Sequence, residues 1–295
     1  SIDAKVIISK FNNYYLFLKI YNYIEKDFNK DAVKNLTFLS KELLPGLKQA
    51  DYKILESIIS ENDCASIPKD DLETSLNILS LNYFGKNENE RYGSPIIDIK
   101  TKSLSTTFSK YLEDEDYQAF VFDFLAIAKY YNDKIQDSGN VLILYNQYTR
   151  LDFLKLVNWR NHEKNMANNI YGYRILDEHI PLFITYHKSE NIDDGIKYED
   201  HFINQEELVW ISRKNVSLSN KEIQQIINHK ATGKTIYIFV KKNDSEGSQH
   251  YYLGEADYVK GSANETTNVT EDKIVTMNFV MKTPIRDDIY RYLVN

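Results

Sequence analysis

Hydrophobic residues recur every three or four positions through the first 140 residues of the chain. This spacing puts apolar side chains on one face of a helix, and it therefore predicts a series of amphipathic helices. The segments with this spacing are 6–21, 33–44, 47–59, 72–84 and 117–131. Acidic residues at 113–116 precede the last segment, where negative charge favours the start of a helix. The first part of the chain is predicted to be a helical domain.

The pattern changes after residue 140. Short runs rich in aromatic and β-branched residues, bounded by polar clusters, predict β-strands. These runs are 180–187, 208–212, 235–241, 250–256 and 274–281. Helices are predicted at 148–157, at 219–227, where Ser219 and Glu222 suggest a capping box, and at 286–293. This order predicts a β-rich α+β domain with a curved sheet or barrel and a few helices.

The polar segment 135–140 contains a glycine and is the predicted domain boundary. We expect a helical domain over residues 1–140 and a β-rich domain over residues 141–295. The composition changes at the same place, because all six histidines and both tryptophans follow residue 140. The first part carries 17 basic and 22 acidic side chains, and the second carries 19 and 21, so the second part is nearly neutral.

The formal net charge of −7 argues against a protein that coats nucleic acid by bulk electrostatics, since that binding needs clustered lysine and arginine. A local basic face is compatible with this charge. Cys64 is the single cysteine, which rules out a disulfide within the chain and favours a reducing, cytoplasmic location. No apolar run approaches the roughly 18 residues that a membrane-spanning helix needs, so no membrane partner is expected.

Three motifs approximate catalytic or phosphate-binding sites. His162 and Lys164 approach the HxK(x)4D pattern of phospholipase-D-type nucleases, but Asn169 stands where the aspartate belongs. Asp98-Ile-Lys100 resembles a strand of metal-dependent nucleases, but such a site needs a second cluster of carboxylates and none lies nearby in the sequence. Gly233-Lys234-Thr235 resembles the end of a phosphate-binding loop, yet it precedes a predicted strand rather than a helix. With metal-ligand spacing also absent, we expect no catalytic residue, metal or cofactor in this chain.

Several stretches of the second part resemble the C-terminal region of the SauUSI-type, ATP-dependent type IV (modification-dependent) restriction endonucleases. They are 148–159, 170–188 with 198–202, 210–213 and 282–292. In that family a nuclease and a helicase lie upstream. The resemblance implies that residues 141–295 recognise 5-methylcytosine or 5-hydroxymethylcytosine in double-stranded DNA. It also implies that residues 1–140 couple recognition to the upstream parts, where ATP and a divalent metal would act.

The resemblance further implies a modified-base reader with an SRA/PUA-like curved sheet or barrel, which extrudes its target base. Extrusion costs a few kcal/mol, offset when the base stacks between aromatic rings and its Watson–Crick edge meets fixed polar groups. A loose alignment implies Tyr186 and Tyr198 as the stacking pair and His187 as a residue that reads the base edge or contacts phosphate. The amino group at N4 of cytosine needs an acceptor, and Asp193, Glu199 and Asp200 remain alternatives.

Trp210 and Ser212 are implied to line the same pocket from a neighbouring strand. Each pocket residue also has an ordinary structural role as its alternative: core packing for the aromatic side chains, since the chain has 23 tyrosines, and solvated turns for the acids. Phosphate contacts are expected from basic residues on nearby loops and helix ends. The available ones are Arg150, Arg160, Lys164, Lys188, Arg213 and Lys214.

Two other functions compete with this interpretation. A nuclease built on Asp98, on His162 or on the acidic residues Asp193, Glu199 and Asp200 would cleave modified DNA by itself. A protein-interaction module without base recognition would also suit an acidic, tyrosine-rich chain.

Overall fold

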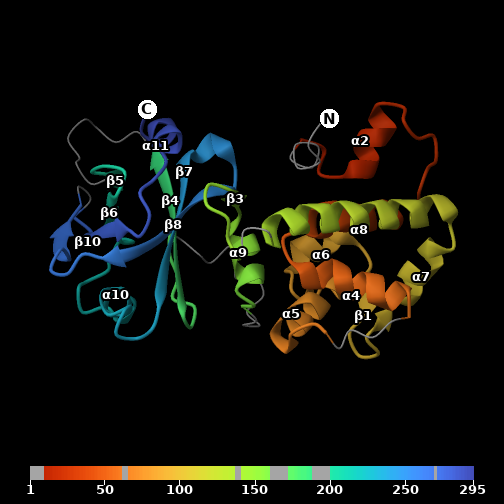
Figure 1. Cartoon of the computed structure of the whole chain (residues 1–295), viewed down its shortest axis with the longest axis horizontal. Coiled ribbons are helices and arrows are strands. Elements are labelled where there is room, and N and C mark those ends of the chain that lie inside the picture. The colour runs from red at the N-terminus through yellow and green to blue at the C-terminus, as the bar shows by residue number, and fades with distance from the viewer. Residues whose placement is uncertain (1–9, 62–65, 137–140, 160–171, 188–199, 269–270) are drawn as a thin grey trace. The chain divides into compact units, whose positions relative to one another are not determined.

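The computed structural model describes residues 10–61, 66–136, 141–159, 172–187, 200–268 and 271–295. The chain divides into two compact units, one helical and one built around a β-sheet (Figure 1). The helical unit comprises Ser1–Val141 and the short segment that begins at Asn158, and the sheet unit comprises Leu142–Val157 and the remainder to Asn295.

The helical unit consists mainly of short helices and one long one. In chain order they are α2 (Tyr14–Ile20), α3 (Lys30–Phe38), the π-helical turn η1 (Leu39–Leu43), α4 (Gln49–Ile59), α5 (Lys69–Leu79), α6 (Lys86–Tyr92), α7 (Thr106–Leu112) and α8 (Glu115–Gln136). A small hairpin of β1 (Ile97–Asp98) and β2 (Ser103–Leu104) separates α6 from α7. Asp98 accepts hydrogen bonds from the backbone N–H groups of Lys100 and Thr101, so it shapes the hairpin turn.

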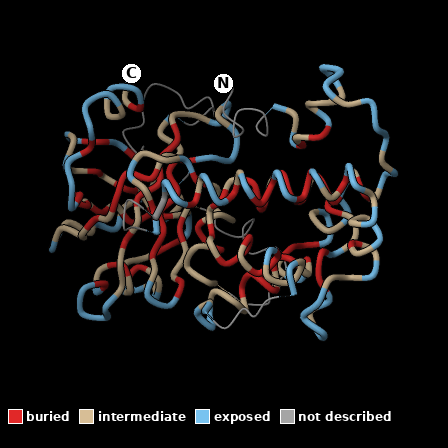
Figure 2. The backbone as a smooth tube through the Cα atoms, turned by 45° about the vertical axis from the view of Figure 1, so that its right-hand side comes forward, coloured by how far each residue is buried: buried red, intermediate tan, exposed pale blue. Residues whose placement is uncertain are grey.

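Helix α8 organises the core of this unit. Tyr117, Val121, Phe124 and Ala128 recur at steps of three and four, and all four are buried. The buried stripe is visible along the long helix in Figure 2. The helix packs against α4, η1 and α7. The described residues of this part thus form mainly helices, as the sequence predicts. The first positions of the predicted helix over 6–21 lie outside the described residues.

In the part of the chain that the structure describes, the sheet unit contains eight strands of one mixed sheet. They are β3 (Gln147–Tyr148), β4 (His179–His187), β5 (His201–Phe202), β6 (Glu207–Ile211), β7 (Thr235–Asn243), β8 (His250–Tyr258), β9 (Asn264–Thr267) and β10 (Lys273–Met281). Its helices are α9 (Arg150–Leu156), α10 (Lys221–Ile227), the 3₁₀ turn η3 (Asp244–Glu246) and α11 (Asp287–Val294). The α+β class predicted for this part is confirmed.

Hydrogen-bonded strands follow the order β4-β7-β8-β10-β6-β5, with β3 added to β8 and β9 added to β10. β4 and β7 are parallel, and the other pairs are antiparallel. Among the described residues this path does not return from β5 to β4. The barrel alternative is therefore wrong, and the sheet is open, because its two end strands have no ladder between them in the part of the chain described.

The two faces of the sheet carry different cores. Alternation along β4 and β7 sends aliphatic side chains to one face and aromatic side chains to the other. The aliphatic face buries Ile180, Leu182, Ile184, Ile236, Ile238 and Val240 with α10 and α11. On the opposite face, Phe153 of α9 contacts Phe239 at a ring-centroid distance of 5.3 Å. Phe239 in turn stacks on Phe183 at 4.6 Å.

Local capping differs in one place from the prediction. Asn220, not Ser219, caps α10, since its side-chain oxygen accepts a hydrogen bond from the N–H of Glu222. Helix α9 begins with a full capping box formed by Thr149 and Asp152. This box fixes the position of Arg150, the first residue of the helix.

Candidate nucleic-acid interface

The parallel strands β4 and β7 end side by side at one edge of the sheet. Their register pairs Thr185 with Lys241 and His187 with Asn243. Successive side chains alternate between the two faces. Tyr186 therefore faces the aliphatic core, whereas Thr185 and His187 face the side that α9 covers.

Two of the residues predicted to contact the base, Tyr186 and His187, lie next to each other at the end of β4. The ring of Tyr186 stacks on Phe202 of β5 at 5.5 Å and an interplanar angle of 15°. Phe202 contacts Tyr290 of α11 at 5.9 Å. His187 is exposed, and its ring meets Tyr186 edge-on at 4.9 Å. The edge thus presents a half-buried tyrosine and an exposed imidazole, supported from one side by a phenylalanine.

The predicted acidic residues are only partly described. Asp200 is 6% exposed, and its Oδ1 accepts a hydrogen bond of 2.8 Å from the backbone N–H of Ile211. That bond ties the residue before β5 to the end of β6. Tyr198, Asp193 and Glu199 lie outside the described residues.

Trp210 and Ser212 lie inside the sheet unit. Trp210 is 2% exposed and contacts the rings of Tyr173 at 5.1 Å and Phe279 at 6.0 Å. The hydroxyl of Ser212 accepts a hydrogen bond from the N–H of Val275 and donates one to the carbonyl of Arg213. Trp210 therefore packs in the core, and the hydroxyl of Ser212 links the end of β6 to β10.

The predicted phosphate-contacting residues have different surroundings. The guanidinium of Arg213 lies 4.3 Å from the ring centre of Tyr173 and forms an ion pair with Glu222. Lys214 forms an ion pair of 3.3 Å with Asp272. Arg160, Lys164 and Lys188 lie outside the described residues. Among the described members of the set, Arg150 alone lies beside the β4–β7 edge.

Two residues not predicted from the sequence join Arg150 there. Arg150 lies over the ring of Phe183, with 5.6 Å from its guanidinium carbon to the ring centre, and the ring of His250 meets Phe183 edge-on at 5.2 Å. Lys241 comes from the end of β7, and its ammonium donates to the carbonyl of Gly247 at 2.9 Å. Lys241 and His250 belong to no motif, because their proximity depends on strand register.

His250 has an unusual environment for a histidine. It is 1% exposed, and its Nδ1 lies 3.1 Å from the carbonyl oxygen of Ser248, so Nδ1 carries the proton that is donated. Burial, then the charges of Arg150 and Lys241, lower the pKa of His250 to about 4. The imidazole is therefore neutral at neutral pH, with the lone pair on Nε2.

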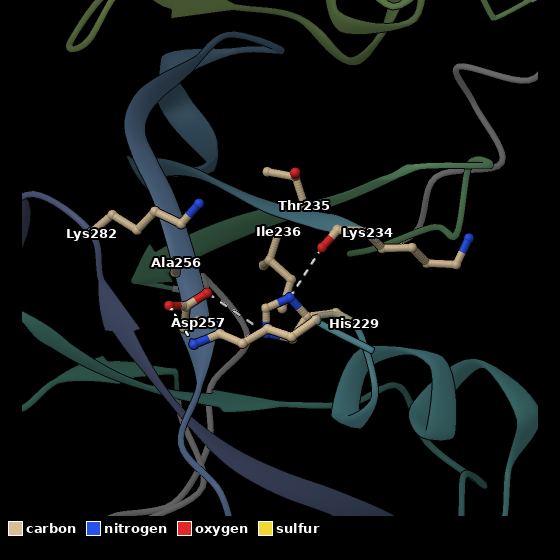
Figure 3. A pocket seen from close by; sticks show the side chains of 8 residues that line it. His229, Lys234, Thr235, Ile236, Ala256, Asp257 and Lys282 are labelled. Atoms are coloured by element: carbon tan, nitrogen blue, oxygen red, sulfur yellow. Dashed lines mark hydrogen bonds and ion pairs between the residues drawn. The ribbon is translucent and has the colours of Figure 1, made fainter. Parts of the chain in front are cut away.

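A separate cavity of about 230 Å³ lies at the opposite end of β7 (Figure 3). Its lining consists of His229, Lys230, Lys234, Thr235, Ile236, Ala256, Asp257 and Lys282. Lys230 forms an ion pair of 2.8 Å with Asp257, and Lys282 forms one of 2.6 Å with Glu255. His229 contacts the carbonyl of Lys234 through Nδ1 and the N–H of Tyr258 through Nε2. Lys230, Lys282 and His229 thus each already have a partner.

The described residues contain no group of three or more histidine, cysteine or acidic side chains arranged to hold a metal ion. In the same residues, no helix combines the length and apolar character needed to cross a membrane.

The chain belongs to the family described as "Domain of unknown function (DUF3427)", which matches residues 142–293. Residues 1–137 match a second family, "Domain of unknown function (DUF8090)". The family matches do not by themselves assign an activity. No curated protein matches the chain.

Solved structures with a remote likeness include DNA complexes. The SRA domain of SUVH5 with hemimethylated CG DNA has 10% identity and a TM-score of 0.33, covering 50% of this chain and 92% of that one. The sulfur-binding and SRA domains of ScoMcrA with phosphorothioated DNA have 9% identity and a TM-score of 0.31, covering 85% and 90%. Arabidopsis thaliana SUVH6 with SAM has 11% identity and a TM-score of 0.32, covering 88% and 41%.

Proposed function

We propose that the sheet unit binds double-stranded DNA containing 5-methylcytosine or 5-hydroxymethylcytosine and extrudes the modified base at the β4–β7 edge. The observation that carries this proposal is the presence of aromatic rings and cations at the same ends of β4 and β7. Tyr186 offers a ring on the aliphatic face there, and His187, Arg150 and Lys241 offer a ring and positive charge on the face that α9 covers. Proteins that hold unstacked bases combine the same two elements, a stacking surface and a basic track for the backbone.

The resemblance to type IV restriction endonucleases supports the same edge. Residues 170–202 loosely resemble the base-binding segment of SRA domains, and the described part of that segment includes β4 and β5. Tyr186 stacks on Phe202, so its ring is held in one orientation before any base arrives. A preorganised ring loses less entropy when it stacks on a base than a mobile one does.

The proposal divides the work between the two units. The sheet unit would read the base, and the helical unit would couple reading to an upstream helicase and nuclease in the same polypeptide, which would use ATP and a divalent metal. Tyr198 would complete the stacking pair, and Asp193 or Glu199 would accept the hydrogen bond from cytosine N4. Asp200 is the weaker candidate for that acceptor, because it already accepts the N–H of Ile211.

The test is binding of the chain to three matched duplexes that differ only in one cytosine, which is unmodified, methylated or hydroxymethylated. Salt is held constant, since phosphate contacts make every affinity salt-dependent. His187→Ala removes an exposed ring without disturbing the core, and Tyr186→Ala removes the stacked one. Tyr130→Ala, at an exposed position of the helical unit, is the control.

Preference for a modified duplex, reduced in the Tyr186 or His187 variant and retained in the control, is the expected result. Equal binding of all three duplexes at every salt concentration would refute base reading and leave an interaction module. Cleavage of the modified duplex by this chain alone, with a divalent metal, would instead establish a nuclease.

A further inference from the structure

The Nε2 atom of His250 is buried and has no hydrogen-bond partner among the described residues. Its other nitrogen is occupied by the carbonyl of Ser248, which can only accept. An imidazole nitrogen left in this state is costly, because a buried polar atom without a partner loses its interaction with water and regains nothing. A ligand that formed a hydrogen bond with this atom would remove that cost.

The surroundings of His250 indicate the charge of that ligand. Among the described residues, the charged groups that act on it are Arg150 at the start of α9, Lys241 at the end of β7 and Asp244 of η3. From β4, the uncharged ring of Phe183 contacts it edge-on. His187, at the end of the same strand, lies on the same face of the sheet. Asp244 forms an ion pair of 3.1 Å with Lys241 and is itself half exposed, so it offsets the positive charge incompletely. Two cations thus lie beside a nitrogen that has no hydrogen-bond partner among the described residues, and an anion would be attracted to both.

The cavity near His229 is a less suitable site for an anion, although it is lined by three lysines. Lys230 and Lys282 each have a carboxylate partner there, and both nitrogens of His229 have hydrogen-bond partners. An anion would have to compete with these partners at two of the three lysines and at both nitrogens of His229. At the β4–β7 edge Lys241 also has a carboxylate partner, Asp244, but Nε2 of His250 has no hydrogen-bond partner among the described residues.

We propose that Arg150, Lys241 and His250 form a binding site for one phosphodiester of the DNA backbone, and that His250 takes up a proton when this anion binds. The inference rests on the proposed function, since it takes DNA as the ligand. Arg150 and Lys241 neutralise the phosphate. The proton comes from solvent and goes to Nε2, which then becomes a donor, while Nδ1 keeps its hydrogen bond to Ser248.

The direction of this coupling follows from the charges. In the free protein, burial and the two cations keep the pKa of His250 at about 4. A bound phosphate cancels part of the cationic field and raises that pKa, so binding brings in a proton and becomes tighter as pH falls. Each unit of increase strengthens binding by at most tenfold, the full factor being reached only below the pKa of the free protein.

The first experiment measures the salt dependence of binding to an unmodified duplex with the full chain. Arg150→Gln and Lys241→Gln are each expected to lower the slope of log affinity against log salt by about one, because each removes one phosphate contact. Lys230→Gln, which alters the cavity at the other end of β7, is the control. Unchanged slopes in both edge variants would overturn the site.

The second experiment measures affinity and proton uptake between pH 7.5 and 5. The wild-type chain is expected to bind more tightly and take up protons as pH falls, and His250→Gln is expected to lose part of both effects. His179→Gln is the matched control, because His179 lies on the same sheet face at the other end of β4 and burial also lowers its pKa. Identical pH profiles for wild type and His250→Gln would overturn the role of His250.

Inorganic phosphate, added at constant ionic strength, separates a DNA site from a site for free phosphate. It is expected not to displace the duplex. Displacement that disappears in Arg150→Gln would overturn the assignment to the DNA backbone. Because these measurements use unmodified DNA, they can succeed even where preference for modified cytosine is absent, and the two proposals can fail separately.

Discussion

Arg150 and Arg213 were both predicted to contact phosphate, and the structure gives them different surroundings. Arg213 lies on the ring of Tyr173 and pairs with Glu222 of α10, so its charge is used within the unit. Arg150 lies over Phe183 at the edge where β4 and β7 end. The sequence identified both as available cations. It did not separate them, because the difference comes from which strands and helices meet around each side chain.

Replacing Arg213 tests that difference. Arg213→Gln removes a cation–π contact and a half-exposed ion pair, and we expect a loss of about 1–2 kcal/mol in the free energy of unfolding. The salt dependence of DNA binding should stay unchanged. Urea unfolding and duplex titration measure the two effects, with Lys214→Gln as the neighbouring control. A lower salt slope without loss of stability would return Arg213 to the DNA interface.

His250 also predicts how stability varies with pH. Its pKa is about 4 in the folded chain, below the ordinary value of 6.5, so the unfolded chain binds the proton more strongly. The unfolded state therefore gains protons first as pH falls, and folding stability decreases between about pH 6.5 and pH 4. Over that window the loss attributable to this group is at most about 3 kcal/mol.

His250→Gln should flatten this acid limb of the stability curve, measured as the free energy of unfolding from urea titrations at several pH values. The comparison is made within each protein, because the substitution also changes stability at neutral pH. An acid limb as steep in the variant as in the wild type would mean that other groups cause it.

The limits of the longer strands could be predicted from the sequence. β4, β6, β7, β8 and β10 begin and end within two residues of the predicted limits, because alternation and β-branched residues are local signals. The very short strands β3, β5 and β9 were not predicted, since they are defined by the neighbours they pair with. The same reason applies to the residues at the β4–β7 edge. The predicted strand limits indicate where Tyr186 lies, but only the strand register brings Lys241 beside Thr185.

A bulge in β8 places Gly254 in a backbone conformation that favours glycine. The pairing of β7 with β8 shifts register between Ile238 and Phe239, and Gly254, opposite Ile238, has φ of +114°. A Cβ at this position would lie 3.1 Å from Cδ2 of Leu144. Left-handed backbone and a close neighbour together disfavour any larger residue here.

Gly254→Ala is therefore expected to lower the free energy of unfolding by about 1–3 kcal/mol. Gly233→Ala is the matched control, because Gly233 also has positive φ, at +67°, and an added Cβ would meet nothing within 4 Å. Chemical denaturation of both variants gives the comparison. Equal losses would show that backbone conformation alone, without the contact to Leu144, accounts for the cost.

At the scale of the whole molecule, the sequence indicated two differently built parts, and the structure contains two compact units. The predicted limits, 1–140 and 141–295, stay a prediction about domains that fold separately. Compactness alone does not establish it, because units of one chain can still unfold together. Whether the two units unfold together also bears on function. Binding in one unit can change the other only if the free energies of the two units are coupled.

One substitution in each core answers it. Phe38→Ala removes a buried ring that contacts Tyr92 at 5.4 Å in the helical unit, and Phe239→Ala removes one that stacks on Phe183 at 4.6 Å in the sheet unit. Each should cost about 3–5 kcal/mol in its own unit. If the units are separate domains, calorimetry of the full chain will resolve two transitions, and each variant will lower only one, while Tyr130→Ala at an exposed site will leave both in place. A single transition whose midpoint temperature falls equally in both core variants would mean that the chain unfolds as one cooperative body. DNA bound to the sheet unit would then also stabilise the helical unit.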